Sequence, residues 1–224
     1  PPHDKNVIAE VAGITSVNEV NFKRNESRIT IIGENIDKLY IEKAAELSLS
    51  PDAVKNQKDL KIVFTPIHGT GIKLIPDLLK RIGFENVTVL QEQAEPNGNF
   101  PTVVYPNPEE PAALDLALKK AEELNGDLVL GTDPDADRVG IAVKNSDGNF
   151  QLLNGNQTGS LLIYYLLRKW SENGKLNGNQ YVVKTIVTTD IIHEIAGRYD
   201  VPCYDTLTGF KYIAEIMGRL EGEK

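Results

Sequence analysis

Short runs of β-branched and apolar residues alternate along this chain with longer segments of helical length. The short runs predict strands, and strands that alternate with helices are typical of parallel sheets covered by helices. The strands are expected at residues 61–64, 87–90, 127–130, 139–143, 150–152, 181–187 and 201–204.

Helical segments separate most of these strands. Between residues 72 and 82 the apolar positions are spaced so that they share one face of a helix. Other helices are expected at residues 34–47, 111–124, 154–170, 190–198 and 209–224. The rest of the first 58 residues is less regular. Five prolines between residues 91 and 111 predict a long ordered loop, and loops of this length inside a domain are often functional.

This order of elements predicts an α/β fold with two similar lobes, each a mixed or parallel sheet flanked by helices. The first lobe is expected to finish with a hairpin, because Asn145–Asn149 is a strong turn sequence between two strands. The pattern starts again at Asn154. We therefore expect one domain over residues 1–153 and a second over residues 154–224.

Composition narrows the class of partner. The 32 acidic residues outnumber the 24 basic ones, so the formal net charge is −8. Binding to nucleic-acid backbones needs clustered lysine and arginine, and the sequence has no basic run, so no nucleic-acid partner is expected. An acidic protein can still bind a phosphorylated metabolite where local cations face that ligand.

The cysteine and histidine content and the hydropathy of the chain exclude several classes of protein. Cys203 is the single cysteine, which excludes an intramolecular disulfide framework and a multi-cysteine zinc site. The three histidines lack metal-ligand spacing, and the apolar run Leu161–Leu167 is far shorter than the roughly 18 residues of a membrane span. We expect a soluble, cytoplasmic protein without a membrane partner.

The segment Asp133-Pro134-Asp135-Ala136-Asp137-Arg138 carries the clearest candidate chemistry. It follows a predicted strand, where open α/β sheets place their ligands. Carboxylates at alternating positions of an extended loop can point to one side, and a hard cation such as Mg²⁺ or Mn²⁺ would relieve their repulsion. A solvated acidic turn is the alternative. An EF-hand is excluded, because the positions that require glycine and glutamate hold Arg138 and Lys144.

Arg138 has two readings in the sequence alone. It either pairs with the three neighbouring acids or reaches a phosphate that shares their cation, since the guanidinium group suits bidentate phosphate binding. The strand-to-helix turn Thr65–Gly71 begins like a dinucleotide fingerprint, but its third glycine would fall at Leu74. His68 in that turn is expected to pack or cap locally.

A second loop, Thr206–Lys211, enters the last predicted helix. Its amides and the Lys211 ammonium could hold a sugar phosphate at the helix N-terminus, although an ordinary helix cap with a surface lysine would look the same. The sequence has no Walker A run, no Gly-x-Ser-x-Gly elbow and no His-Glu-x-x-His, so no nucleophile for phosphoryl transfer is identified.

Taken together and in this order, these segments resemble the phosphoglucomutase/phosphomannomutase family of α-D-phosphohexomutases. The resemblance rests on Pro2–Asn6, Phe64–Gly71, Phe100–Val103 with the proline-rich Pro106-Asn107-Pro108-Glu109-Glu110, Asp133–Arg138, Gly155-Asn156-Gln157 and Thr206–Lys211. The sequences of Pro106–Glu110 and Thr206–Lys211 are most similar to the branch that contains phosphoglucomutase and phosphopentomutase.

The resemblance implies an intramolecular phosphotransferase with four domains, in which a phosphoserine of domain 1 exchanges phosphate with the sugar through a bisphosphate. It implies that Asp133, Asp135 and Asp137 bind Mg²⁺ and that Arg138 contacts the phosphoserine. Thr208, Gly209 and Lys211 are expected to contact the sugar phosphate. A glucose 1,6-bisphosphate-type activator is expected for the complete enzyme.

The resemblance also implies that this chain covers domain 2 and part of domain 3 of a longer protein. The Ser-His-Asn-Pro loop of domain 1, the sugar-specificity loop of domain 3 and domain 4 are not among the 224 residues. We expect the chain alone to be inactive, and its sugar is not determined. A non-enzymatic sugar-phosphate binding module and a nucleotide-binding α/β protein are the alternatives.

Overall fold

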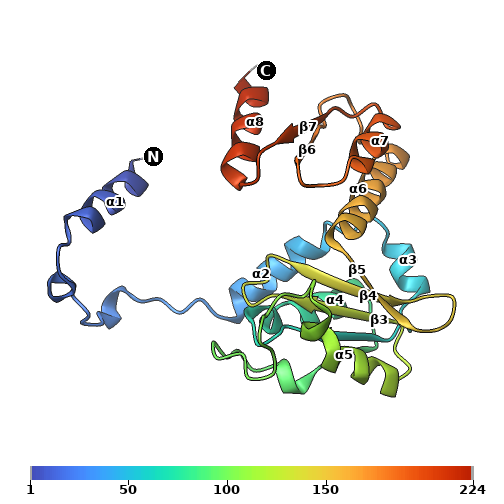
Figure 1. Cartoon of the computed structure of the whole chain (residues 1–224), viewed down its shortest axis with the longest axis horizontal. Helices are drawn as coiled ribbons and strands as arrows, with labels where there is room; N and C mark the ends of the chain where they lie inside the picture. The colour runs from blue at the N-terminus through green and yellow to red at the C-terminus, as the bar shows by residue number, and fades with distance from the viewer. Residues whose placement is uncertain (1, 223–224) are drawn as a thin grey trace. The chain divides into compact units, whose positions relative to one another are not determined.

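The computed structural model describes residues 2–222 of the 224-residue chain. The chain divides into two compact units, of which the first ends at Asp37 and the second begins at Lys38. The second unit, coloured from light blue to red in Figure 1, contains every strand of the described residues. The first domain predicted from the sequence, residues 1–153, also includes the first unit.

The first unit contains more helix than the sequence pattern indicated. Helix α1 (His3–Gly13) is followed by two 3₁₀ turns, η1 (Val17–Glu19) and η2 (Glu26–Arg28). The expectation of a single helix in the first 58 residues is wrong, because α1 and the short α3 (Pro51–Asn56) join the predicted α2 (Glu34–Ala45). Helix α1 has no buried residue, which explains why its sequence carries no strong amphipathic pattern.

The larger sheet of the second unit is mixed and has five strands in the order β2-β1-β3-β4-β5. Strand β1 pairs in parallel with both β2 and β3, and the pairs β3–β4 and β4–β5 are antiparallel. The strands are β1 (Ile62–Thr65), β2 (Val87–Val89), β3 (Leu128–Thr132), β4 (Val139–Lys144) and β5 (Phe150–Leu153). Each lies within two residues of its expected position.

Two helices cover the parallel part of this sheet. Helix α4 (Ile75–Ile82) connects β1 to β2, and α5 (Pro111–Glu123) connects β2 to β3. The two crossovers run in opposite directions across the sheet, so right-handed connections place the helices on opposite faces. This explains why all four residues of β1 are buried. Helix α5 buries a stripe of alanines, Ala113, Ala117 and Ala121, against the sheet.

The predicted helix 72–82 is interrupted near its start. Residues Thr70–Lys73 form a 3₁₀ turn, η3, and the α-helix begins only at Ile75. Pro76 accounts for the break, because proline lacks an N–H donor and is tolerated only in the first turn of a helix. The proline-rich segment after β2 is an ordered loop, as expected, with one 3₁₀ turn, η4 (Gln91–Gln93).

The hairpin after β4 is built by Asn145. Its side-chain oxygen accepts hydrogen bonds from the backbone N–H groups of Asp147 and Asn149, both at 3.0 Å. Gly148 has a φ of +82°, a conformation that favours glycine. The turn that the sequence predicted therefore joins β4 to β5.

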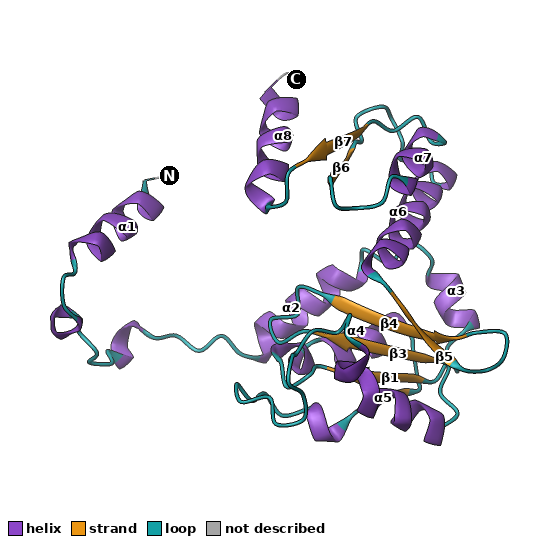
Figure 2. Cartoon of the chain, in the orientation of Figure 1, coloured by secondary structure: helices purple, strands orange, loops and turns teal. Residues whose placement is uncertain are grey.

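The last lobe is smaller (Figure 2). Helix α6 (Gly155–Glu172) opens with a capping box between Asn154 and Gln157. It is followed by β6 (Val182–Thr185), α7 (Ile191–Gly197), β7 (Cys203–Thr206) and α8 (Phe210–Gly222). Strands β6 and β7 pair in parallel, and the core of the lobe joins α6, α7 and both strands through Leu167, Val182, Ile192, Ala196 and Val201.

An α/β fold with mixed and parallel sheets flanked by helices is therefore confirmed. Among the residues that the structure describes, no helix is long and apolar enough to cross a membrane.

Candidate functional site

Three carboxylates converge directly after strand β3. One oxygen from each of Asp133, Asp135 and Asp137 lies within 4.8 Å of the others. Ala136 makes this possible, because its φ of +61° and a 3.0 Å hydrogen bond from its N–H to the Asp133 carbonyl turn the loop back on itself. The loop is therefore bent and not simply extended, and the bend gathers the side chains.

The charges of this loop are only partly balanced. Asp133 is 7% exposed, and one of its carboxylate oxygens accepts a 2.9 Å hydrogen bond from the Arg138 backbone N–H. The Arg138 side chain lies 3.9 Å from carboxylate oxygens of Asp133 and Asp137, at the outer limit of an ion pair. Three aspartates and one arginine leave a local charge of about −2. Carboxylate oxygens with this residual charge fit a divalent hard cation.

The geometry of Arg138 is consistent both with pairing to the neighbouring acids and with contact to a phosphate, the two interpretations that the sequence left open. Its backbone supports Asp133, while its guanidinium group pairs loosely with the acids and is 55% exposed. A guanidinium group has five N–H donors, and two contacts at 3.9 Å leave most of them available. The side chain can therefore reach an anion placed beside the carboxylates.

The turn Thr65–Gly71 lies against this loop. His68 is buried and its ring contacts the Glu95 carbonyl and the Thr102 hydroxyl, so it packs locally as expected. A Cβ at Gly69 would lie 2.4 Å from Pro134 Cα. The space that a nucleotide-binding glycine leaves for a pyrophosphate is thus filled by the chain itself, which argues against the dinucleotide reading.

The second candidate site lies between β7 and α8 in the smaller lobe. Thr208 and Gly209 precede the helix, and Lys211 lies in its first turn. Gly209 has a φ of +132°, and its carbonyl accepts a 3.0 Å hydrogen bond from the Tyr212 N–H. The Lys211 ammonium lies 4.8 Å from the centre of the Tyr212 ring, a cation–π distance. The three residues are thus held together at the start of α8.

Comparison with known families finds two matches along the chain. The description "Phosphoglucomutase/phosphomannomutase, alpha/beta/alpha domain II" fits residues 38–148, and "alpha/beta/alpha domain III" of the same family fits residues 154–222. The chain belongs to the phosphoglucomutase/phosphomannomutase family. The two matches contain the carboxylate loop and the Thr208–Lys211 loop, respectively.

Individual relatives agree with this assignment. A Haemophilus influenzae protein described as "Probable phosphomannomutase" is 36% identical over 222 residues, which is 99% of this chain and 43% of the relative. The chain thus spans less than half the length of that relative. Because the family description includes both mutases, the phosphoglucomutase/phosphopentomutase branch stays a prediction.

Solved structures of the family share the fold. A phosphoglucomutase/phosphomannomutase family protein from Burkholderia thailandensis superposes with a TM-score of 0.64 at 19% identity, covering 83% of this chain and 36% of that one. Aspergillus fumigatus N-acetylphosphoglucosamine mutase in complex with GlcNAc-6P and magnesium gives 0.55 at 16% identity, covering 84% and 38%.

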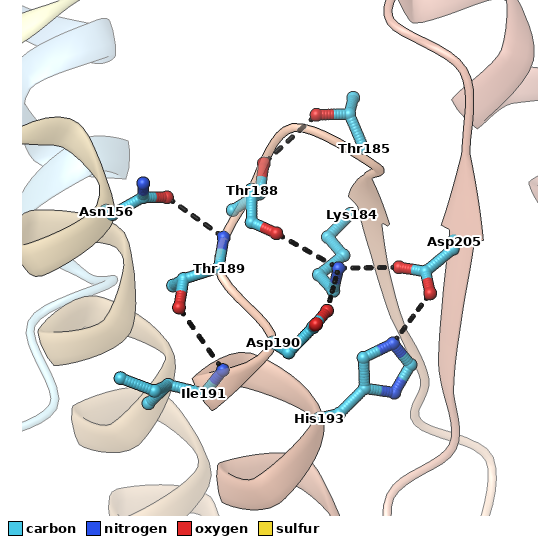
Figure 3. A network of polar contacts seen from close by, with 9 residues as sticks. All are labelled: Asn156, Lys184, Thr185, Thr188, Thr189, Asp190, Ile191, His193 and Asp205. Carbon is cyan, nitrogen blue, oxygen red and sulfur yellow. Dashed lines mark hydrogen bonds and ion pairs between the residues drawn. The ribbon is translucent and has the colours of Figure 1, made fainter.

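The domain III region of this phosphohexomutase chain contains a polar network that the sequence analysis missed (Figure 3). Lys184 on β6 has a side chain that is only 4% exposed. Its ammonium lies 2.7 Å from Asp205 and 3.1 Å from Asp190, and it donates to the Thr188 carbonyl at 3.1 Å. His193 contacts the other Asp205 oxygen at 2.9 Å.

The network shifts the pKa values of Asp205 and Lys184. The hydrogen bond from Lys184, followed by that from His193, holds the pKa of Asp205 below its usual range. The same bond to Asp205 is the main cause of the raised pKa of Lys184. All three N–H donors of the ammonium have partners, so a new anion would have to replace one of them. The sequence signal that could have indicated this network is a lysine at an inward-facing position of strand Val182–Thr185, in which buried and half-buried residues alternate.

Proposed function

We propose that this chain is the metal-binding and phosphosugar-binding part of a phosphosugar mutase that interconverts sugar 1-phosphates with 6- or 5-phosphates. The convergence of Asp133, Asp135 and Asp137 within 4.8 Å, with a residual charge of about −2, supports this proposal most strongly. Family membership supports the reaction class, an intramolecular phosphoryl transfer.

The three aspartates would hold Mg²⁺, or Mn²⁺ in its place. Bound there, the cation would neutralise negative charge on the phosphoryl group in transfer. The protein's own contribution is a preformed loop: Ala136 bends it, and the Arg138 backbone orients Asp133. The exposed Arg138 guanidinium is placed to contact the phosphate that faces the carboxylates.

Thr208, Gly209 and Lys211 would hold the phosphate of the sugar. They lie at the start of helix α8, whose N-terminal N–H groups favour an anion. Lys211 adds a positive charge there, and its contact with Tyr212 limits the directions in which the ammonium can point.

The phosphoserine donor is proposed to come from a domain outside these 224 residues. The sequence contains no Ser-His-Asn-Pro segment, so the chain alone is expected to show no mutase turnover. No choice among glucose, mannose, ribose and deoxyribose phosphates is proposed. Domain boundaries near residues 153 and 154 and a cytoplasmic location belong to the same proposal.

Calorimetric titration with Mn²⁺ tests the metal site directly. The chain is compared with Asp135→Ala and with Asp147→Ala, a matched control in the exposed hairpin. We expect binding in the chain and in the control and loss of binding in Asp135→Ala. Equal binding in all three would reject the carboxylate site. Absence of binding in all three would mean that this chain lacks a metal site when the phosphoserine is not present.

A further inference from the structure

Thr70, which is not a candidate metal ligand, makes two hydrogen bonds to the middle of the carboxylate loop. The Thr70 backbone N–H donates to the Pro134 carbonyl at 2.8 Å, and the Thr70 hydroxyl donates to the same oxygen at 3.1 Å. Pro134 stands between the ligand candidates Asp133 and Asp135. A shift of its peptide group would therefore move both carboxylates.

Gly69 adds a close backbone contact with Pro134 to these hydrogen bonds. A Cβ on Gly69 would meet Cα, the carbonyl carbon and the oxygen of Pro134 at 2.4–2.8 Å. These are backbone atoms, which cannot rotate away as a side chain can. Gly69 therefore lets the turn approach the loop to a distance that no other residue type permits.

The turn that makes these contacts is itself fixed. Ile67 and His68 have φ values of +47° and +59°, which are costly for residues other than glycine and persist only where the surroundings hold them. The His68 N–H donates to the Gln93 carbonyl at 2.9 Å, and the His68 carbonyl accepts from the Asn97 N–H at 3.0 Å. The proline-rich segment thus holds the strained turn from both sides.

The His68 ring completes this support. Its Nδ1 faces the Glu95 carbonyl at 3.1 Å, and a carbonyl can only accept, so Nδ1 carries the proton. In the neutral ring Nε2 then accepts from the Thr102 hydroxyl at 2.9 Å. That hydroxyl in turn accepts from the Gln93 side-chain amide at 2.9 Å. Each of these polar groups has one assigned role, and the turn has little freedom to move.

We propose that Thr70 is a positioning residue for the metal loop. Its hydroxyl and N–H hold the Pro134 peptide so that the aspartates on either side converge before a cation arrives. The inference rests on the proposed metal-binding function, but it concerns a residue outside the carboxylate loop. Loss of the hydroxyl is expected to loosen the loop and weaken cation binding, while the neighbouring fold stays intact.

Three variants separate the hydroxyl from the shape of the side chain. Thr70→Val removes the hydroxyl, and Thr70→Ser keeps it. Thr88→Val makes the same change on the edge strand β2, where no hydrogen bond of the threonine hydroxyl is found among the described residues. In Mn²⁺ calorimetry we expect Thr70→Val to bind about threefold to tenfold more weakly than the chain itself. Thr70→Ser and Thr88→Val should bind as the unmodified chain does.

Hydrogen exchange without metal provides a second readout. The Ala136 N–H is bonded to the Asp133 carbonyl and the Arg138 N–H to the Asp133 side chain, so both amides report the shape of the loop. Their exchange should accelerate in Thr70→Val and not in Thr70→Ser or Thr88→Val. Unchanged exchange in Thr70→Val would overturn the proposal.

The two experiments also separate this inference from the proposed function. If the unmodified chain binds no Mn²⁺, the metal site fails in this chain, and the exchange rates still decide whether Thr70 shapes the loop. If the chain binds Mn²⁺ and Thr70→Val binds equally well, the positioning role of Thr70 is rejected while the metal site stands.

Discussion

Lys184 and Asp205 are register partners on the parallel strands β6 and β7, and the ammonium lies 2.7 Å from the carboxylate. The lysine side chain is almost completely buried, whereas the aspartate is 43% exposed. A buried ammonium without a partner would be costly, so Asp205, with Asp190 and the Thr188 carbonyl, allows a lysine to face inward from this strand.

The charge of Asp205 is therefore expected to stabilise the fold in a pH-dependent way. The folded-state pKa of this group is depressed, so its contribution is fully present above the ordinary aspartate pKa of about 3.9 and is lost as the pH falls through the lower folded value. Asp205→Asn should lower the Tm by a few degrees at pH 7. The difference from the unmodified chain should shrink below about pH 4.

Thermal unfolding followed by circular dichroism between pH 3 and pH 8 measures this difference. Asp147→Asn, on the exposed hairpin, provides the control for loss of a surface carboxylate. Equal Tm values for Asp205→Asn and the unmodified chain at pH 7 would contradict the prediction. So would a difference that stays constant down to pH 3.

The contact between Gly69 and Pro134 predicts that alanine is not tolerated at position 69. The added methyl group would overlap backbone atoms, and overpacking of this kind costs about 1–3 kcal/mol. For a chain of this size that corresponds to a Tm lower by about 2–12 °C. Gly98→Ala is the matched control, because a Cβ there meets nothing within 4 Å. If the two variants unfold at the same temperature, the close approach is not tight in solution.

The left-handed conformation of Ala136 predicts opposite effects for two substitutions. Ala136→Gly accepts a φ of +61° without strain and should keep Mn²⁺ binding. Ala136→Val places a β-branched residue where the left-handed region is strongly disfavoured, so the loop should open and binding should weaken about tenfold. Calorimetry on both variants measures the ratio. Equal affinities would show that the bend at Ala136 is not needed to gather the carboxylates.

Local sequence was sufficient for much of the fold. Apolar spacing placed the strands and most helices, and Asn145–Asn149 marked the hairpin, because these signals depend on neighbours along the chain. Helices α1 and α3 were missed, and α1 has no buried face to create a periodic pattern. The helix expected from residue 72 begins at Ile75, since Pro76 allows only a first-turn position.

By itself the sequence determined the α/β class, the family resemblance and the carboxylates of Asp133, Asp135 and Asp137 as the candidate metal ligands. Their spacing along one loop is a local property that can be read directly. Only the tertiary structure showed that Thr70 donates hydrogen bonds to the Pro134 carbonyl and that Lys184 is buried against Asp205. Those pairs are separated by 64 and 21 residues, and such contacts depend on how parallel strands align across a sheet, which no local pattern specifies.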